Sequence, residues 1–174
     1  MPYTIEKIAK LIGAERIGDT EARIDWILTD SRSLCFPEET LFFALLTRRN
    51  DGHKYIGELY NRGVRNFVIS ELLSELENYK DCNFLKVSNP LKALQKLAEY
   101  RREEFQIPVI GITGSNGKTI VKEWLYQLVS PDRTVTRSPR SYNSQIGVPL
   151  SVWLMNEESQ LAIFEAGISE MGEM

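Results

Sequence analysis

The chain has 174 residues, 43% of them hydrophobic, which is enough for one medium domain or two small ones, and its net charge of −3 gives no general attraction to nucleic acid. Two cysteines are too few for a disulfide framework, and a single histidine argues against a zinc site. The sequence shows no signal peptide and no apolar run of membrane-span length, so we expect a cytoplasmic protein without membrane insertion.

The first half of the sequence alternates between strand-like and helix-like segments. A helix is expected after Thr4, which can cap it, with apolar residues along one face and Gly13 near its end. Strands are expected at 24–28, 41–45, 67–70 and 84–87, and helices at 54–62 and 72–79. This alternation predicts a small α/β domain over residues 1–88.

A domain boundary is expected at Ser88-Asn89-Pro90. Ser88 or Asn89 can cap a helix, and Pro90 suits a first helical turn. The apolar stripe from Leu91 to Ala98 then predicts a helix whose stripe makes core contacts. Residues 89–174 would form the first part of a second domain with a parallel sheet.

The most informative feature of the second half is the segment Gly111–Thr119, with the sequence GITGSNGKT. An apolar run at 109–113 predicts a buried strand before it, and apolar residues from Val121 to Leu128 predict a helix after it. A strand, a glycine loop and a helix in this order are typical of a phosphate-binding loop, or P-loop. The alternative is a glycine turn that merely joins a strand to a helix.

The loop residues suit the binding of ATP and Mg²⁺. Gly114 and Gly117 permit backbone angles that other residues avoid, and N–H groups at a helix N-terminus face an anion. Lys118 would neutralise the β- and γ-phosphates, and the Thr119 hydroxyl would join the shell of a Mg²⁺ ion. The expected nucleotide-binding residues are Gly114, Ser115, Asn116, Gly117, Lys118 and Thr119.

After the loop, a strand is expected at 133–136, a helix at 149–154 and a strand at 161–165. The last strand ends in a carboxylate, Glu165. Because the carboxyl ends of parallel strands face the ligand crevice, Glu165 would lie beside the loop and serve Mg²⁺ directly or through water. A nucleotide domain needs more parallel strands than these, so we expect the chain to be an N-terminal piece of a longer enzyme.

Two polar segments are further candidates. Thr29-Asp30-Ser31-Arg32 follows a predicted strand, where such side chains can bind a ligand or simply close a turn. Asn143 lies in a polar loop between the glycine loop and Glu165, and its amide suits phosphate or sugar oxygens. From the residues alone, the turn is the favoured interpretation of the first segment.

The glycine spacing of the loop, with Thr-Gly-x-Asn-Gly-Lys-Thr at its centre, resembles the Mur ligase family. The Thr29–Arg32 segment, Leu41–Leu45 and Asp51-Gly52-His53 are similar to the uridine-binding N-terminal domain of that family. NSQIGVP (143–149) and FEAGISEMGEM (164–174) resemble the branch that adds D-alanyl-D-alanine. The branch that adds the third residue would show Thr-Thr-Pro and a Glu followed by paired serines, and neither pattern is present.

The resemblance implies an α/β fold in which a small uridine-binding domain precedes the start of a P-loop-type ATP-binding domain. It implies an ATP- and Mg²⁺-dependent ligase that adds D-Ala-D-Ala to UDP-MurNAc-tripeptide through an acyl phosphate, in peptidoglycan synthesis and thus in cell shape and division. Lys118 and Asn143 would be catalytic, Thr119 and Glu165 would serve the metal, and Thr29, Asp30, Ser31 and Arg32 would hold the uridine nucleotide. The remaining central and C-terminal domains, and in some bacteria a fused alanine racemase, would be its partners in the chain.

The sequence departs from the family pattern at two places. Ser144 replaces a second asparagine, and Leu46-Thr47 replaces a Lys-Gly pair whose basic contact Arg48 or Arg49 could supply. Two other functions are open: a stand-alone nucleotide-sugar binding module, and a P-loop NTPase or kinase unrelated to the cell wall. The first would be a native product ending near Met174, and the second would release phosphate from ATP alone.

Overall fold

The computed structural model describes all residues except 1–2, 48–49, 75 and 168–174. It has two compact units, one running to Leu97 and the other starting at Ala98. The division falls inside helix α3 (Pro90–Glu103), further along the chain than the expected boundary after Ser88. Arg48, Arg49 and the end of the segment 164–174 lie outside the described residues.

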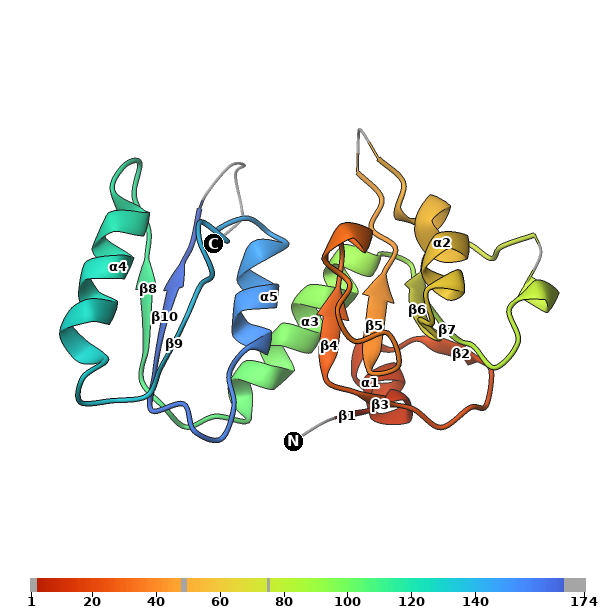
Figure 1. Ribbon diagram of the computed structural model, residues 1–174, viewed down its shortest axis with the longest axis horizontal. Helices are drawn as coiled ribbons and strands as arrows, with labels where there is room; N and C mark the ends of the chain where they lie inside the picture. The colour runs from red at the N-terminus through yellow and green to blue at the C-terminus, as the bar shows by residue number, and fades with distance from the viewer. Residues whose placement is uncertain (1–2, 48–49, 75, 168–174) are drawn as a thin grey trace. The chain divides into compact units, whose positions relative to one another are not determined.

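The first unit is built on a five-stranded sheet with the order β2-β7-β6-β5-β4 (Figure 1). Strands β4 to β7 pair in parallel, and β2 is antiparallel to β7. A separate antiparallel pair joins β1 to β3. The strands are β1 (Tyr3–Thr4), β2 (Glu15–Ile17), β3 (Arg23–Ile24), β4 (Trp26–Leu28), β5 (Thr40–Phe43), β6 (Asn66–Ile69) and β7 (Asn83–Lys86). The predicted α/β class is confirmed.

Helices and short 3-10 turns connect these strands. They are α1 (Ile5–Ile12), η1 (Ser31–Ser33), η2 (Gly52–Tyr55), α2 (Ile56–Asn61) and η3 (Leu76–Asn78). Aromatic rings from three neighbouring strands form much of the core: Phe67 stacks on Phe84 with a centroid distance of 5.4 Å and meets Phe42 edge-on at 6.4 Å. Packing of these rings fixes the register of the parallel strands, because a slip by one residue would move them to the opposite face of the sheet and break the ring contacts.

Helix α1 forms where the capping residues predict it. The Thr4 hydroxyl accepts a hydrogen bond from the backbone N–H of Lys7 at 3.2 Å, and Gly13 ends the helix with a left-handed φ of 69°. Ile5, Ile8, Ala9 and Ile12 are buried, while Leu11 is only half-buried. Local capping signals are therefore sufficient to place this helix.

Two predictions for the first unit are wrong in detail, and short strands were missed. The expected strand 24–28 is interrupted at Asp25, where the chain changes from pairing with β1 to pairing with β5. The expected helix 72–79 is replaced by the short turn η3, because Leu73, Leu76 and Tyr79 pack on the core from an irregular segment. Strand β2 was not predicted, since its alternation is too short to recognise.

The second unit contains a three-stranded parallel sheet with the order β8-β10-β9. Its elements are β8 (Val109–Ile112), α4 (Lys118–Val129), β9 (Val135–Arg137), α5 (Gly147–Trp153) and β10 (Leu161–Glu165). Figure 1 shows α4 on one side of this sheet and α5 on the other. Strand β10 lies in the centre and all of its residues are buried, whereas the edge strand β8, which was expected to be buried, leaves Ile110 and Gly111 exposed.

Helix α3 begins at Pro90, and the Asn89 side chain accepts a hydrogen bond from the backbone N–H of Lys92 at 3.1 Å. Of the two candidates, Ser88 and Asn89, it is thus Asn89 that caps the helix. Further along, Arg101 is buried and donates to the carbonyl oxygen of Met155 at 2.5 Å, within the second unit.

No helix among the described residues is both long and apolar enough to cross a membrane.

The apolar residues that predicted helix α4 do not form a buried face in this structure. Val121, Trp124 and Leu128 are exposed, Trp124 by 65% and Leu128 by 73%, and the buried residue of α4 is Lys122. The spacing of the apolar residues identified the helix correctly, but most of these residues lie on the exposed side of α4. The covered side carries the charged residues that build the site.

Candidate functional site

The glycine loop leads from β8 into α4 with the backbone angles that its glycines were expected to allow. Gly114 has a φ of 140° and Gly117 a φ of 77°, both in the region that L side chains avoid. A Cβ added at Gly117 would meet nothing within 4 Å, so the backbone angle and not crowding requires glycine there. Helix α4 starts at the next residue, which turns its first N–H groups toward the loop.

Lys118 lies over the loop that precedes it. Its Nζ donates to the carbonyl oxygen of Gly114 at 2.5 Å, and its side chain is half-buried. Ser115 and Asn116, in the middle of the loop sequence, are exposed. The ammonium group therefore lies beside the glycine loop and the N-terminus of α4. A phosphate bound there would be stabilised by the ammonium group and by backbone N–H groups together.

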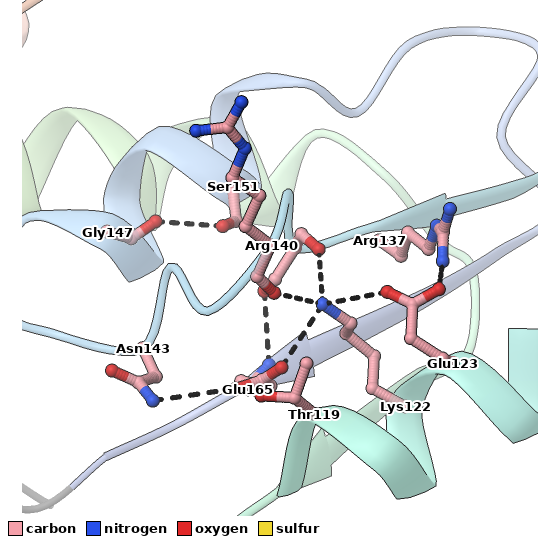
Figure 2. Close-up of polar contacts among 10 residues, drawn as sticks. Thr119, Lys122, Glu123, Arg137, Arg140, Asn143, Gly147, Ser151 and Glu165 are labelled. Atoms are coloured by element: carbon pink, nitrogen blue, oxygen red, sulfur yellow. Dashed lines mark hydrogen bonds and ion pairs between the residues drawn. The ribbon is translucent and has the colours of Figure 1, made fainter.

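The carboxyl edge of the sheet brings together three expected residues from distant parts of the sequence (Figure 2). Glu165 at the end of β10 pairs in register with Ile112 at the end of β8. Its Oε2 accepts a hydrogen bond from the Thr119 hydroxyl at 3.1 Å and a longer one from Nδ2 of Asn143 at 3.5 Å. The side chain of Glu165 is completely buried.

The loop that carries Asn143 is held against the segment after β10. The backbone N–H of Gly167 donates to the carbonyl oxygen of Asn143 at 2.7 Å, and a Cβ on Gly167 would come within 2.9 Å of that oxygen. At the other end, the Ser144 hydroxyl accepts from the backbone N–H of Gly147 at 3.1 Å. Ser144, which departs from the family pattern, thus stabilises the start of α5.

Sequence reasoning did not identify Lys122, the buried charge of this site. Its Nζ lies 3.1 Å from Oε1 of Glu165 and donates to the carbonyl oxygen of Ser138 at 2.8 Å. Ser138 also accepts, through its hydroxyl, the backbone N–H of Glu165 at 3.1 Å. A signal was present: Lys122 follows Lys118 by four positions, so both lie on the same face of α4.

The oxygen atoms of this edge fit a magnesium ion. Glu165 Oε2 and the Thr119 hydroxyl are the hard oxygen ligands that Mg²⁺ prefers, whereas Oε1 of Glu165 is paired with Lys122. No group of three or more His, Cys, Asp or Glu side chains that could hold a metal occurs in the described part of the chain. The edge therefore suits a Mg²⁺ ion that takes further oxygens from nucleotide phosphates and water.

The expected uridine-binding residues lie in the first unit, at the carboxyl end of β4. Asp30 caps the turn η1 by accepting the backbone N–H of Arg32 at 3.1 Å, and the Arg32 guanidinium binds the Asp30 carboxylate at 2.7 Å. That guanidinium lowers the pKa of Asp30 below its usual range. Ser31 is buried, and its carbonyl oxygen accepts from Arg62 at 2.7 Å. The segment thus closes a turn and presents an arginine beside it.

Asp51 and His53 connect two strand ends of the same unit. Asp51 Oδ1 accepts the backbone N–H of His53 at 2.9 Å and lies 2.7 Å from its Nδ1, while His53 Nε2 accepts the backbone N–H of Ser70 at 3.1 Å. The intervening Gly52 leaves no room for a side chain, because a Cβ there would lie 2.6 Å from the backbone nitrogen of Leu45. The pair holds the loop after β5 against the end of β6.

Comparison with known proteins gives one consistent result. Residues 112–174 match the model of the Mur ligase middle domain. The UDP-N-acetylmuramoyl-tripeptide–D-alanyl-D-alanine ligase of Borreliella burgdorferi is 34% identical over 175 residues, which cover 97% of this chain and 37% of the relative. The Bacillus subtilis protein of the same name is 30% identical over 174 residues, covering 98% and 37%.

Solved structures agree with these relatives. The crystal structure of MurF from Acinetobacter baumannii has a TM-score of 0.86 and 28% identity, and the match covers 99% of this chain and 37% of that one. The MurF ligase from Thermotoga maritima in complex with ADP has a TM-score of 0.71 and 28% identity, covering 84% and 33%. The chain therefore spans little more than a third of the length of the relatives it matches, 37% for the first of them.

Proposed function

The chain belongs to the Mur ligase family, and from this premise we propose that it is the N-terminal part of an ATP-dependent ligase that joins D-alanyl-D-alanine to UDP-N-acetylmuramoyl-tripeptide in the cytoplasmic synthesis of peptidoglycan precursors. The observation that carries the proposal is the meeting of Lys118, Thr119 and Glu165 at one edge of a parallel sheet. Relatives of this name match nearly the whole chain.

The reaction has two steps in this proposal. The tripeptide carboxylate attacks the γ-phosphoryl group of ATP, giving an acyl phosphate and ADP. The amine of D-alanyl-D-alanine then attacks the acyl carbon, and inorganic phosphate leaves as the amide bond forms. Such chemistry depends mainly on positioning and on neutralising charge, which suits a site made of a cation, backbone N–H groups and oxygen ligands.

The residues of the second unit divide this work. Lys118 and the N–H groups of residues 114–119 neutralise and orient the phosphates. A Mg²⁺ ion held by Thr119 and Glu165 would supply further positive charge at the transferring phosphoryl group. The amide of Asn143 points toward the same carboxylate oxygen as Thr119, which supports a role for Asn143 beside the reacting groups. In the first unit, Thr29, Asp30, Ser31 and Arg32 hold the uridine nucleotide.

The decisive experiment is to measure phosphate release from ATP by the full-length protein, with UDP-MurNAc-tripeptide and D-Ala-D-Ala added separately and together. We expect release that requires both substrates. Release from ATP alone would favour a P-loop NTPase or kinase instead, and binding of the uridine substrate without any turnover would favour a nucleotide-sugar binding module. Because residues 1–174 represent about a third of the relatives, we expect this piece alone to give no ligation.

A further inference from the structure

Lys122 is fully buried on a helix whose apolar side chains are largely exposed. Its side chain has 0% exposure, whereas Ile120 and Trp124 on the same helix are open to solvent. Lysine is almost never fully buried unless its charge is paired, because removing an ammonium group from water is costly. Packing alone gives no reason for this arrangement.

Oxygen atoms from three segments surround the ammonium group of Lys122 (Figure 2). Nζ donates to the carbonyl oxygens of Ser138, at 2.8 Å, and of Arg140, both in the loop after β9. It lies 3.1 Å from Oε1 of Glu165 at the end of β10, and 3.2 Å from Oε1 of Glu123 on its own helix. One cation therefore connects a helix, a loop and the end of the central strand.

This arrangement assigns different partners to the two oxygens of Glu165. Oε1 faces Lys122, and Oε2 faces the Thr119 hydroxyl and Asn143. The backbone of Glu165 is fixed as well, since its N–H donates to the hydroxyl of Ser138 at 3.1 Å. With one oxygen drawn to Lys122, the carboxylate can rotate little, and its second oxygen stays directed at the expected metal position.

We propose that Lys122 is a positioning residue of the nucleotide site. It holds the Glu165 carboxylate so that Oε2 faces Thr119 and a Mg²⁺ ion bound with nucleotide, and it holds the 138–143 loop that carries Asn143. Lys122 makes no contact with the phosphates itself, since its ammonium group is enclosed by protein oxygens. The inference rests on the proposed function, because a site for nucleotide and Mg²⁺ is what the positioning serves.

The test is calorimetric titration of the full-length protein with ADP, in EDTA and over a range of Mg²⁺ concentrations, for the wild type and Lys122→Met. We expect the variant to bind ADP in EDTA within about twofold of the wild type, because Lys118 and the loop N–H groups are unchanged. Mg²⁺ should tighten ADP binding, and the Mg²⁺ concentration at which half of this effect is reached measures the affinity for the metal. We expect that concentration to be about 10- to 100-fold higher in the variant, because a group that orients a metal ligand is lost.

A double-mutant cycle separates positioning from a merely structural role. If Lys122 acts through Glu165, the double variant Lys122→Met/Glu165→Gln should need the same Mg²⁺ concentration for half of the effect on ADP binding as Glu165→Gln alone. The matched control is Lys10→Met, the same substitution at an exposed lysine of α1, which should change neither binding constant. Three outcomes would each overturn the proposal. They are an equal loss of ADP binding with and without Mg²⁺, an unchanged Mg²⁺ dependence of ADP binding in Lys122→Met, and additive effects of the two substitutions in the double variant.

Removing one partner of a buried ion pair can prevent folding, so circular dichroism of Lys122→Met comes first. If that variant is unfolded, a crystal structure of the wild-type protein with Mg²⁺ and ADP decides. The proposal is supported if Nζ of Lys122 contacts Oε1 of Glu165 and the metal is bound by Oε2. It is refuted if the metal is bound by Oε1 or if Lys122 has moved away from Glu165. Since only ADP and Mg²⁺ are used, these outcomes are independent of whether phosphate release requires both ligase substrates.

Discussion

Lys118 and Lys122 lie on the same face of α4, yet they meet different surroundings. Lys118 is half-buried and, among the residues that the structure describes, donates to the carbonyl oxygen of Gly114, so its charge remains available to an incoming phosphate. Lys122 is enclosed by four protein oxygens. The same residue type can therefore bind a ligand at one position and organise the site at the other, because the number of fixed acceptors around it differs.

We expect Lys118→Ala in the full-length protein to lower substrate-dependent phosphate release at least about 100-fold, since a charge that stabilises the transferring phosphoryl group is lost. Binding of UDP-MurNAc-tripeptide should stay within about twofold, because the proposed uridine residues lie in the other unit. Phosphate release and binding of the labelled uridine substrate measure the two effects. Lys10→Ala, at an exposed lysine, is the control. Equal loss of both would contradict the assignment of the two sites to separate units.

Asp51 offers a test of acid sensitivity in the first unit. The backbone N–H and the ring of His53 lower the pKa of this carboxyl below the ordinary value of 3.8. The stabilisation is therefore present above pH 3.8 and is lost as the pH falls through the lower pKa of the folded state. Asp51→Ala should lower the free energy of unfolding by about 1 kcal/mol near neutral pH, as for a lost cap.

The variant Asp51→Asn separates the hydrogen bond from the charge, because its amide oxygen can still accept the N–H of His53. We expect it to be less destabilised than Asp51→Ala in urea unfolding. The difference between wild type and Asp51→Ala should shrink as the pH drops below 3.8. A difference that grows in acid would show that the carboxylate does not stabilise the fold.

At the scale of elements, the parallel strands decide where chemistry can occur. Strands β8, β9 and β10 run in one direction, so the segments that follow them lie at one edge of the sheet. The glycine loop, the 138–143 loop and Glu165 meet there although more than forty positions separate Thr119 from Glu165, whose side chains are 3.1 Å apart. Strand β10 was predicted with its true bounds, because a fully buried central strand is a continuous apolar run.

The start of helix α4 depends on Gly117, whose φ is 77°. Gly117→Ala should destabilise the protein by about 1–2 kcal/mol and weaken ADP binding, because a left-handed angle is unfavourable for alanine. Gly111→Ala in β8 is the matched control: an added Cβ meets nothing within 4 Å there and the backbone is not left-handed. Thermal unfolding and ADP titration of both variants should separate them. Similar behaviour of the two would mean that the loop tolerates another backbone conformation.

For the molecule as a whole, the exposed apolar side of α4 is a surface that a further part of a longer chain could cover. Ile120, Val121, Trp124 and Leu128 are all exposed, and so is Ile110 on the neighbouring strand β8. Exposed apolar groups this close together usually mark a contact surface. The chain spans 37% of the Borreliella burgdorferi relative, so residues that could form such a cover exist there.

We therefore expect amide hydrogen exchange in α4 to be slower in the full-length protein than in residues 1–174 alone. Helix α1, whose apolar side chains are already buried within the first unit, should exchange at the same rate in both and serves as the control. Mass spectrometry of peptic peptides from the two proteins measures this. Unchanged exchange in α4 would indicate that its apolar side stays open to solvent in the complete protein.

Local sequence signals were sufficient to predict the α/β class, helix α1 with both caps, the start of α3, strand β10 and the glycine loop between a strand and a helix, while the roles of Lys118 and Thr119 remain predictions. These features depend on local requirements: a capping side chain, a backbone angle that only glycine tolerates, or an apolar run. The sequence also named Asn143 and Glu165 as candidates, whose roles remain predictions.

The folded chain was needed to show which side of α4 is covered, where the strand 24–28 is interrupted, and that the described residues of 72–79 form no α-helix. It alone revealed Lys122 and its contact with Glu165. The physical reason is common to these cases: burial, pairing partners and the environment of a charge are set by segments distant in sequence. The spacing of apolar residues can identify a helix, but the side that the fold covers depends on what packs against it.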